Sequence, residues 1–158
     1  MATSLKSLSA HSSKNIKDIA NKTFGIIVSE WNEEVTESLF SGAYQTLIQN
    51  GAKKENIIRK NVPGSFELTL AAQWLAQDEK VDAVICLGCV IQGETRHFDF
   101  ICDAVAHGIT NVGLKYNKPV IFGVLTPGTQ QQAMDRAGGK HGNKGDEAAI
   151  TAVKMLGF

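Results

Sequence analysis

The chain has 158 residues, of which 43% are hydrophobic and 20% charged, as in an ordinary globular protein with one sizeable core. Sixteen basic residues balance sixteen acidic ones, so no overall charge attracts nucleic acid or a membrane surface. No apolar run approaches the roughly 20 residues that cross a bilayer. We therefore expect no nucleic-acid partner, no membrane span and a cytoplasmic location.

Residues 1–20 are predicted to form an N-terminal arm, and residues 21–158 a single domain, because no low-complexity linker or internal repeat follows the arm. The first apolar run, TFGIIVSEW (Thr23–Trp31), is β-branched and continuous and predicts a buried strand. Apolar residues then recur every four positions over residues 33–51. This spacing predicts an amphipathic helix, which Gly51 would cap.

The middle of the chain continues the alternation of strand and helix. NIIRKNVP (residues 56–63) predicts a second strand that Pro63 ends, and a helix is expected over residues 65–77 with Ser65 as its cap. The most hydrophobic run, VDAVICLGCVIQ (residues 81–92), has the composition of a strand covered on both faces.

The last third of the chain predicts a long helix over residues 94–117, a strand over residues 119–126, and two closing helices over residues 129–138 and 143–158. The long helix is expected to turn five residues inward: Phe98, Ile101, Cys102, Val105 and Ile109.

Strands that alternate with helices predict an α/β fold with right-handed crossovers. We expect a three-layer α/β/α sandwich, flavodoxin-like, with a central four-stranded parallel sheet. Ligands of such sheets bind beyond the carboxyl ends of the strands. The residues that follow the strands, SEWN, VPGSFE, IQGETRH and LTPGT, are therefore the expected site.

The three cysteines are not predicted to form a disulfide or a metal site. Cys86 and Cys89 are an odd number of residues apart on one strand, so their thiols should lie on opposite faces of the sheet. His97, Asp99 and Cys102 point in different directions on a helix, which disfavours a metal site there. We expect the cysteines to behave as small buried apolar residues.

The first two turns each allow two interpretations. Trp31 could stack on a flat heterocycle or cover the edge of the core. In PGSFE, the amides of Ser65 and Phe66 could donate to a ligand, and Glu67 could accept from ligand hydroxyls. The alternative for this turn is simple helix capping, and the sequence does not decide between the two.

The third turn combines Gly93 with the amides of Glu94 and Thr95, which are expected to begin the long helix and to bind an anion. His97 would then lie one helical turn in, beside the anion, where an imidazole can accept and donate a proton at neutral pH. The alternative is that His97 caps the helix or packs on Phe98.

The segment DRAGGKHGNKG gathers Arg136, Lys140 and Lys144 around glycines. It is not a Walker loop, because no Ser or Thr follows the lysine and no strand precedes it. An arginine is a natural phosphate partner. The alternative is a solvated basic turn.

Four motifs in order and spacing, VPGSFELTLAA, GCVIQGETRHFDF, PVIFGVLT and DRAGGKHGNKG, resemble the lumazine synthase family from Phe24 to Leu156. The resemblance implies the condensation of 5-amino-6-(D-ribitylamino)uracil with 3,4-dihydroxy-2-butanone 4-phosphate in riboflavin biosynthesis. Because the substrate's own amine forms the imine, no lysine nucleophile of the protein is required. The resemblance also implies that no metal or organic cofactor is needed.

The resemblance also implies roles for residues that bind the first substrate. Trp31 matches the aromatic residue that stacks on the pyrimidine ring. Ser65, Phe66 and Glu67 match the segment that holds the ribityl chain.

Other matched positions complete the pyrimidine site. The backbone that binds the pyrimidinedione matches Cys89, Val90 and Ile91. Phe122 matches an aromatic residue contributed by the neighbouring subunit, and Lys144 matches a basic residue near the pyrimidine.

The remaining matched positions concern phosphate and protons. Glu94 and Thr95 match the phosphate turn through their amides, and Arg136 matches the phosphate-binding arginine. His97 matches the proton-transfer residue. Glu147 is assigned no role.

The resemblance further implies a homo-oligomer built from pentamers, with the site between adjacent subunits. GGKHGNKG is similar to the linker of members that form 60-subunit icosahedral shells, which we expect here, and the arm is expected to add a strand to a neighbour's sheet. Two alternatives remain. One is a non-catalytic cage or flavin-binding protein on the same scaffold. The other, a flavodoxin-like electron carrier, is disfavoured because SEWNEE lacks a phosphate loop rich in Ser, Thr and Gly.

Overall fold

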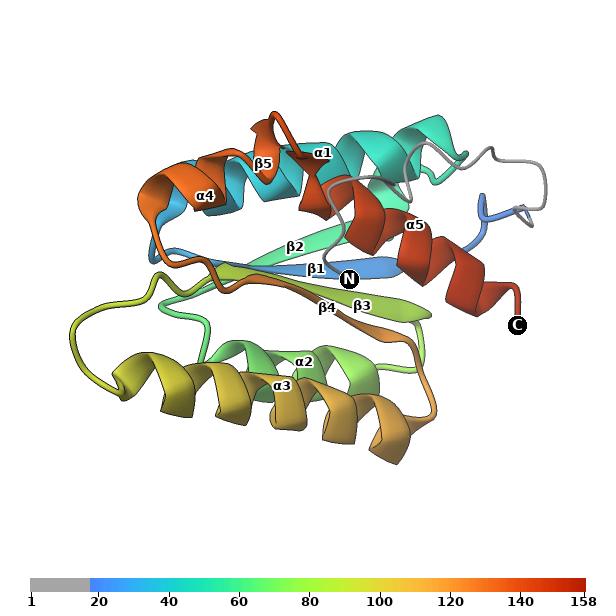
Figure 1. The fold of residues 1–158 in the computed structure, drawn as a ribbon. Coiled ribbons are helices and arrows are strands. Elements are labelled where there is room, and N and C mark those ends of the chain that lie inside the picture. The colour runs from blue at the N-terminus through green and yellow to red at the C-terminus, as the bar shows by residue number, and fades with distance from the viewer. Residues whose placement is uncertain (1–17) are drawn as a thin grey trace.

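A computed structural model describes residues 18–158, so most of the predicted N-terminal arm lies outside the described residues. A four-stranded sheet forms the centre of the molecule (Figure 1). Its strands are all parallel and lie in the order β2-β1-β3-β4. Their bounds are β1 (Phe24–Ser29), β2 (Ile57–Val62), β3 (Ala83–Cys89) and β4 (Val120–Leu125).

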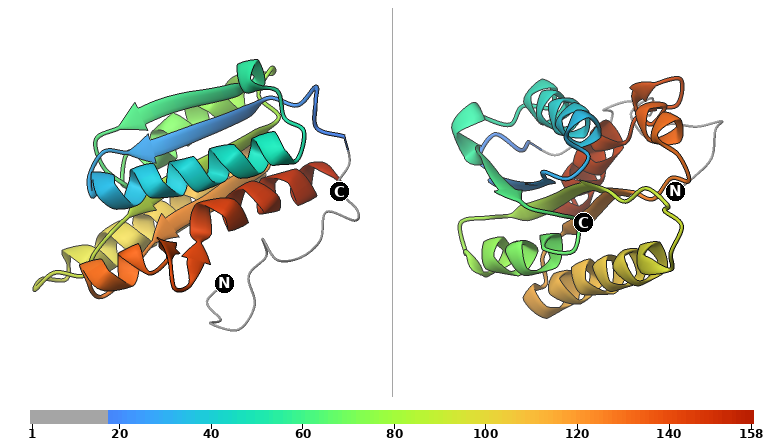
Figure 2. Two further views of the ribbon diagram at one scale, coloured as in Figure 1. Left: turned by 90° about the horizontal axis from the view of Figure 1, so that it is seen from above. Right: turned by 90° about the vertical axis from the view of Figure 1, so that its left-hand side faces the viewer.

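Helices cover both faces of this sheet, which confirms the predicted three-layer sandwich. One face carries α1 (Glu33–Gln49) and α5 (Lys144–Leu156), which run side by side across it (Figure 2). The other face carries α2 (Leu68–Gln77) and α3 (His97–Tyr116) (Figure 1). A short helix, η2 (Lys54–Asn56), precedes β2. None of the helices that the structure describes is long and apolar enough to span a membrane.

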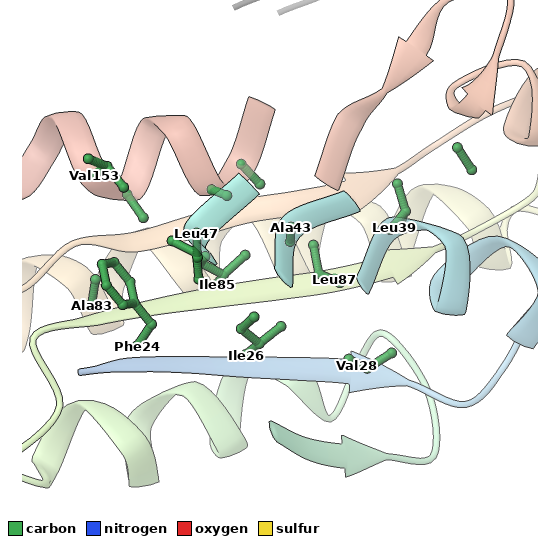
Figure 3. Close-up of a cluster of buried hydrophobic side chains, with 14 of the residues drawn as sticks. Phe24, Ile26, Val28, Leu39, Ala43, Leu47, Ala83, Ile85, Leu87 and Val153 are labelled. Atoms are coloured by element: carbon green, nitrogen blue, oxygen red, sulfur yellow. The ribbon is translucent and has the colours of Figure 1, made fainter. Parts of the chain in front are cut away.

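The core is built by alternation along β3, which is buried at every position. Ile85 and Leu87 join the cluster under α1 and α5 (Figure 3), and Cys86 joins the cluster under α2 and α3. Cys89 lies in the first cluster, so the two thiols of CLGC do face opposite sides of the sheet. Burial raises the pKa of Cys86 and that of Cys89 to about 12, so both thiols are protonated at neutral pH.

The close approach of α1 and α5 depends on glycine. A Cβ on Gly145 would collide with the carbonyl oxygen of Leu39, and a Cβ on Gly42 would lie 2.6 Å from the side chain of Asn143. Leu39, Ala43 and other residues of the predicted four-residue repeat are buried here, and this confirms the amphipathic helix.

Three predicted boundaries were wrong, and each error falls at the carboxyl end of the sheet. The second helix begins at Leu68 rather than at Ser65, because residues 65–67 form a turn. The strand predicted to reach residue 92 ends at Cys89. The long helix begins at His97, so Glu94 and Thr95 lie in a bend before it. Of its five expected inward residues, Val105 and Ile109 are buried and the others are half-buried.

The helix predicted over residues 129–138 was also too long. Helix α4 spans only Gln130–Met134, and an antiparallel hairpin of β5 (Ala137–Gly139) and β6 (Gly142–Asn143) follows it. Gly138 and Gly142 have φ of 112° and 73°, a left-handed conformation that ends a helix and suits a tight turn.

Candidate active site

Hydrogen bonds tie the first two turns together at the carboxyl end of the sheet. The backbone N–H of Trp31 donates to the carbonyl of Pro63 at 3.1 Å, and that of Glu30 donates to Val62 at 2.8 Å. These bonds continue the pairing of β1 with β2 beyond the last residues of the strands. The segment after β1 and the PGSFE turn are therefore held side by side.

Further bonds connect the end of β3 to its neighbours. The Nδ2 of Asn32 donates to the carbonyl of Cys89 at 2.9 Å, and the N–H of Val90 donates to that of Leu125 at 2.8 Å. The N–H of Gln92 donates to Pro127 at 3.0 Å. All four predicted turns are thus linked into one surface.

Trp31 lies at the rim of this surface with 74% of its area exposed. The alternative that it covers the edge of the core is therefore wrong. The residue that follows it, Asn32, has φ of 62° and is the N-cap of α1. This left-handed residue turns the chain sharply after Trp31.

The PGSFE turn does not place Ser65 as a helix cap. The hydroxyl of Ser65 is buried and has no hydrogen-bond partner among residues 18–158. Glu67 instead accepts from the N–H of Gly64 at 3.0 Å, and Phe66 is 53% exposed. The turn is closed by Glu67, whose exposed carboxylate retains acceptor capacity for a ligand.

The backbone at Cys89, Val90 and Ile91 was expected to bind a ligand, but only some of its donors and acceptors are free. The carbonyl of Cys89 is taken by Asn32, and the N–H of Val90 is taken by Leu125. In the described part of the chain, the N–H and carbonyl of Ile91 and the carbonyl of Val90 make no hydrogen bond. The N–H and carbonyl of Ile91 lie on the same side of the extended chain, so Ile91 offers one donor and one acceptor side by side, whereas the carbonyl of Val90 points to the other side.

The bend before α3 is exposed throughout residues 94–97. The N–H groups of Glu94, Thr95 and Arg96 make no hydrogen bond within residues 18–158, and that of His97 reaches Thr95 Oγ1 only at 3.4 Å. The imidazole of His97 is exposed and makes no capping bond, so the interpretation of His97 as a helix cap is wrong. Within the described residues, amides without a hydrogen bond therefore lie next to an imidazole that has no partner.

The basic segment is more ordered than a solvated turn. Lys140 pairs with Asp135 at 3.0 Å. Lys144 pairs with Glu147 at 2.6 Å, and these two side chains are only 19% and 12% exposed. Arg136 donates through Nη1 to the carbonyl of Gln132 at 3.0 Å.

Arg136 is consequently the member of the three that has no carboxylate partner among the described residues. Glu147, which the sequence analysis left without a role, is the residue that neutralises Lys144. The spacing of these two residues on a helix was the available signal, because residues three apart can pair.

Phe122 does not join the other predicted residues within one chain. It lies on the edge strand β4, opposite Cys86, three positions before the strand ends, and it is 43% exposed. Strand β3 stands between it and Trp31, which follows β1. Among residues 18–158, no group of three or more His, Cys, Asp or Glu side chains is placed to hold a metal ion.

Known proteins of one family are similar to this chain over nearly all of its described residues. Residues 21–158 match the family model described as 6,7-dimethyl-8-ribityllumazine synthase. A protein of that name from Cytophaga hutchinsonii is 66% identical over 99% of this chain and 98% of its own length. Proteins of the same name are 52% identical in Parabacteroides distasonis, over 100% of this chain and 99% of theirs, and 52% identical in Flavobacterium johnsoniae, over 98% and 82%.

Proposed function

The chain belongs to the 6,7-dimethyl-8-ribityllumazine synthase family, and we propose that it condenses 5-amino-6-(D-ribitylamino)uracil with 3,4-dihydroxy-2-butanone 4-phosphate on the surface formed by the four turns. It is an enzyme of the transferase class and acts in riboflavin biosynthesis. One observation carries the assignment of the site: the hydrogen bonds that link the turns leave an exposed indole, a free backbone edge and free amides on one surface.

The pyrimidine is assigned to the side of this surface between β1 and β3. Trp31 presents an exposed aromatic face, and aromatic rings gain from offset stacking. The free N–H and carbonyl of Ile91 suit a neighbouring acceptor and donor of a pyrimidinedione. Glu67 and the turn around it receive the ribityl hydroxyls, with Lys144 near the ring.

The phosphate is assigned to the bend before α3. The three amides at residues 94–96, which make no hydrogen bond within residues 18–158, precede the positive end of a long helix, which is a favourable place for an anion. Arg136 supplies a guanidinium that no carboxylate of the described residues neutralises. His97, next in the chain, adjoins the reacting carbons of a substrate whose phosphate is held there.

The chemistry then requires proton transfers and little else. The amine of the pyrimidine attacks the ketone and forms an imine with loss of water. Phosphate leaves, the product tautomerises, and the ribityl-bearing nitrogen closes the ring with loss of a second water. His97 gives and takes the protons. Holding two substrates together can contribute about 7–11 kcal/mol in favourable cases.

A second copy of the chain is proposed to complete the site. Phe122 cannot reach Trp31 within one chain, because β3 separates their strands. The outer side of α2 and α3 exposes Leu70, Trp74, Phe100 and Leu114 at 50–77% of their areas, the kind of surface that subunits bury. We propose a pentamer-based homo-oligomer in the cytoplasm and favour a 60-subunit shell, given the short β5–β6 hairpin.

The test is turnover of the purified protein with both substrates. We expect a fluorescent product and released phosphate only when both are present, and light scattering that gives the mass of a pentamer or a multiple of it. A yellow protein that retains flavin and forms no product would support the flavin-binding alternative and reject the proposed function.

A further inference from the structure

We propose that Asn32 is a positioning residue that fixes the distance between Trp31 and the backbone edge of β3, so that a flat heterocycle fits between them. This inference rests on the proposed assignment of the pyrimidine to that side of the site. Two independent features of Asn32 carry it: its backbone conformation and the partner of its side chain.

The backbone of Asn32 is in the left-handed region, with φ of 62° and ψ of 47°. Its carbonyl accepts from Val35 and Thr36 at 3.0 and 3.1 Å, so the residue both ends the segment after β1 and begins α1. Residues other than glycine rarely adopt this conformation, and asparagine is among those that tolerate it best. The turn sets the direction in which α1 leaves the segment that carries Trp31.

The side chain of Asn32 does not do what asparagine does at most helix starts. An N-cap asparagine normally accepts a hydrogen bond from the second or third amide of its helix. Here no side-chain capping bond forms, and Nδ2 donates instead to the carbonyl of Cys89 at 2.9 Å. Helix α1 therefore lacks a side-chain N-cap bond from Asn32, and the same side chain connects the turn to β3 instead.

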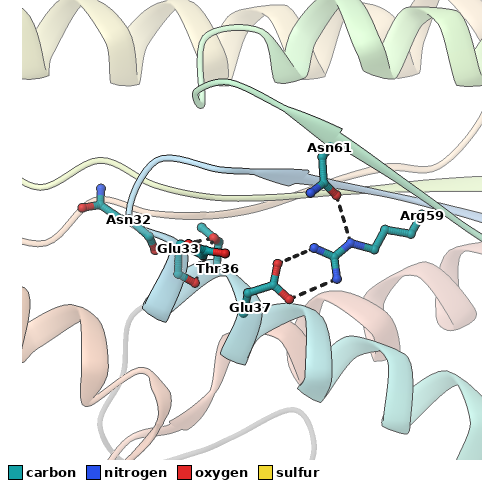
Figure 4. A network of polar contacts seen from close by, with 6 residues as sticks. All are labelled: Asn32, Glu33, Thr36, Glu37, Arg59 and Asn61. Carbon is teal, nitrogen blue, oxygen red and sulfur yellow. Dashed lines mark hydrogen bonds and ion pairs between the residues drawn. The ribbon is translucent and has the colours of Figure 1, made fainter.

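A separate set of contacts connects the first turns of α1 to β2. Arg59 on β2 bonds to Glu37 of α1 and to Asn61, and its guanidinium lies 4.3 Å from the centre of the Phe40 ring. Figure 4 shows Asn32 apart from this network. The bond to Cys89 is therefore the tie that links the Trp31 segment to β3, whereas the Arg59 network links α1 to β2.

The consequence for a ligand follows from the geometry. Cys89 is buried and immediately precedes the free groups at Val90 and Ile91. Because the amide of Asn32 is bonded to that strand end, the indole beside Asn32 and the backbone edge keep a fixed separation. Loss of the bond should loosen pyrimidine binding and leave the phosphate site, on the bend before α3, unchanged.

Two substitutions separate the bond from the backbone conformation. Asn32→Gly keeps the left-handed turn and deletes the side chain, and Asn32→Asp keeps the shape but offers Cys89 an acceptor instead of a donor. We expect each to raise the KM for the pyrimidine by about tenfold, the effect of one lost hydrogen bond, with kcat and the KM for the phosphorylated ketone nearly unchanged.

The chain offers a matched control in Asn117, the other asparagine of the described residues with positive φ (49°), which ends α3 at the far end of the sheet. Asn117→Gly and Asn117→Asp should leave both KM values as in the wild type. If the Asn32 variants also kept the wild-type pyrimidine KM, or lost affinity for both substrates equally, the proposal would be overturned.

A direct binding measurement complements the kinetics. Trp31 and Trp74 are the two tryptophans of the chain, so in a Trp74→Phe background the fluorescence reports on Trp31. We expect the pyrimidine to quench this signal, with a Kd about tenfold weaker after Asn32→Asp. Equal Kd values with clear quenching would reject the role of Asn32 alone. A wild-type protein that turned over neither substrate would reject the proposed function itself.

Discussion

The two ends of the central sheet treat their polar groups differently. At the amino end, the carboxylate of Asp82 accepts from Lys22 Nζ at 2.9 Å and from the N–H of Thr23 at 2.8 Å. Nearby, Lys118 donates through Nζ to the carbonyl of Asp78 at 2.7 Å. These polar groups at the amino end are thus paired with one another by hydrogen bonds.

The carboxyl end leaves such groups unpaired. The buried hydroxyls of Ser29 and Ser65 have no partner within the described residues, and the N–H of Ile91 is free. Unpaired polar groups are uncommon in folded proteins and each is costly, so a concentration of them points to a ligand. Contacts that stabilise the fold thus gather at the amino ends of the strands, and groups available to a ligand gather at the carboxyl ends.

The largest expected effect at the carboxyl end comes from His97→Ala. Loss of the acid–base group should lower kcat by roughly 10²–10⁴-fold. The melting temperature and the assembled mass should stay unchanged, because the side chain is exposed and makes no hydrogen bond in the described part of the chain. Steady-state assays, thermal melts and light scattering test this. Unchanged turnover would remove His97 from the mechanism.

Arg136→Ala should have the next largest effect. Without the guanidinium, the KM for the phosphorylated ketone should rise by about 10–100-fold, the worth of charge-assisted hydrogen bonds, while the KM for the pyrimidine changes little. Lys140→Ala is the matched control, because Lys140 is already paired with Asp135. If Arg136→Ala weakened only the pyrimidine, the two ligand positions would have to be exchanged.

At the amino end, Asp82→Ala should change stability and leave catalysis intact. The partly exposed carboxylate of Asp82 accepts two hydrogen bonds. Their loss should lower the free energy of unfolding by about 1–2 kcal/mol. Denaturant titration measures the loss, and kcat and both KM values should match the wild type. A catalytic defect without a loss of stability would break the distinction between the two ends.

The smallest effect concerns acid and the hairpin that carries Arg136. Hydrogen bonds from Gln131 and Lys140 hold the pKa of Asp135 below its usual value of 3.8. A lowered carboxyl pKa stabilises the fold above the unfolded pKa, and the contribution is lost as the pH falls below about 4. Melting temperatures of the wild type and Asp135→Asn should therefore differ at pH 6 and converge toward pH 2.

Asp146 works in the opposite sense. Burial raises its pKa, so protonation in acid relieves a cost of the charged form and partly offsets the loss at Asp135. Asp146→Asn is the control for Asp135→Asn, because it removes a carboxylate whose pKa is raised rather than lowered. If the melting temperature of Asp135→Asn ran parallel to that of the wild type from pH 6 to pH 2, the hairpin would owe nothing to this carboxylate.

The sequence predicts the sheet well because burial dominates it. The run AVICLGC has no polar position, and β3 is buried throughout. The predictions are less accurate where the backbone conformation of single residues determines the structure. Gly138 and Gly142, both with positive φ, place a hairpin in a segment whose composition favours a helix. The bend at Glu94 and Thr95 likewise moves the start of α3 to His97.

In the site, the location of Trp31 after β1 and of His97 after β3 follows from the order of strands and turns, but the exposure of Trp31 is known only from the fold. Asn32 and Glu147 were missed for a physical reason. An asparagine before a helix predicts a cap, and only the fold shows that its amide reaches Cys89. A carboxylate three residues after Lys144 resembles an ordinary surface pair, and only the fold shows that the pair is mostly buried.

The contact of α5 with α1 has a consequence for synthesis. The apolar face formed by Ile85 and Leu87 is covered by α1 and by Ala149 and Val153 of the last helix (Figure 3). A nascent chain on the ribosome therefore carries an uncovered apolar layer until α5 has emerged. We expect copies that lack α5 to expose this apolar layer and therefore to be prone to aggregation and proteolysis.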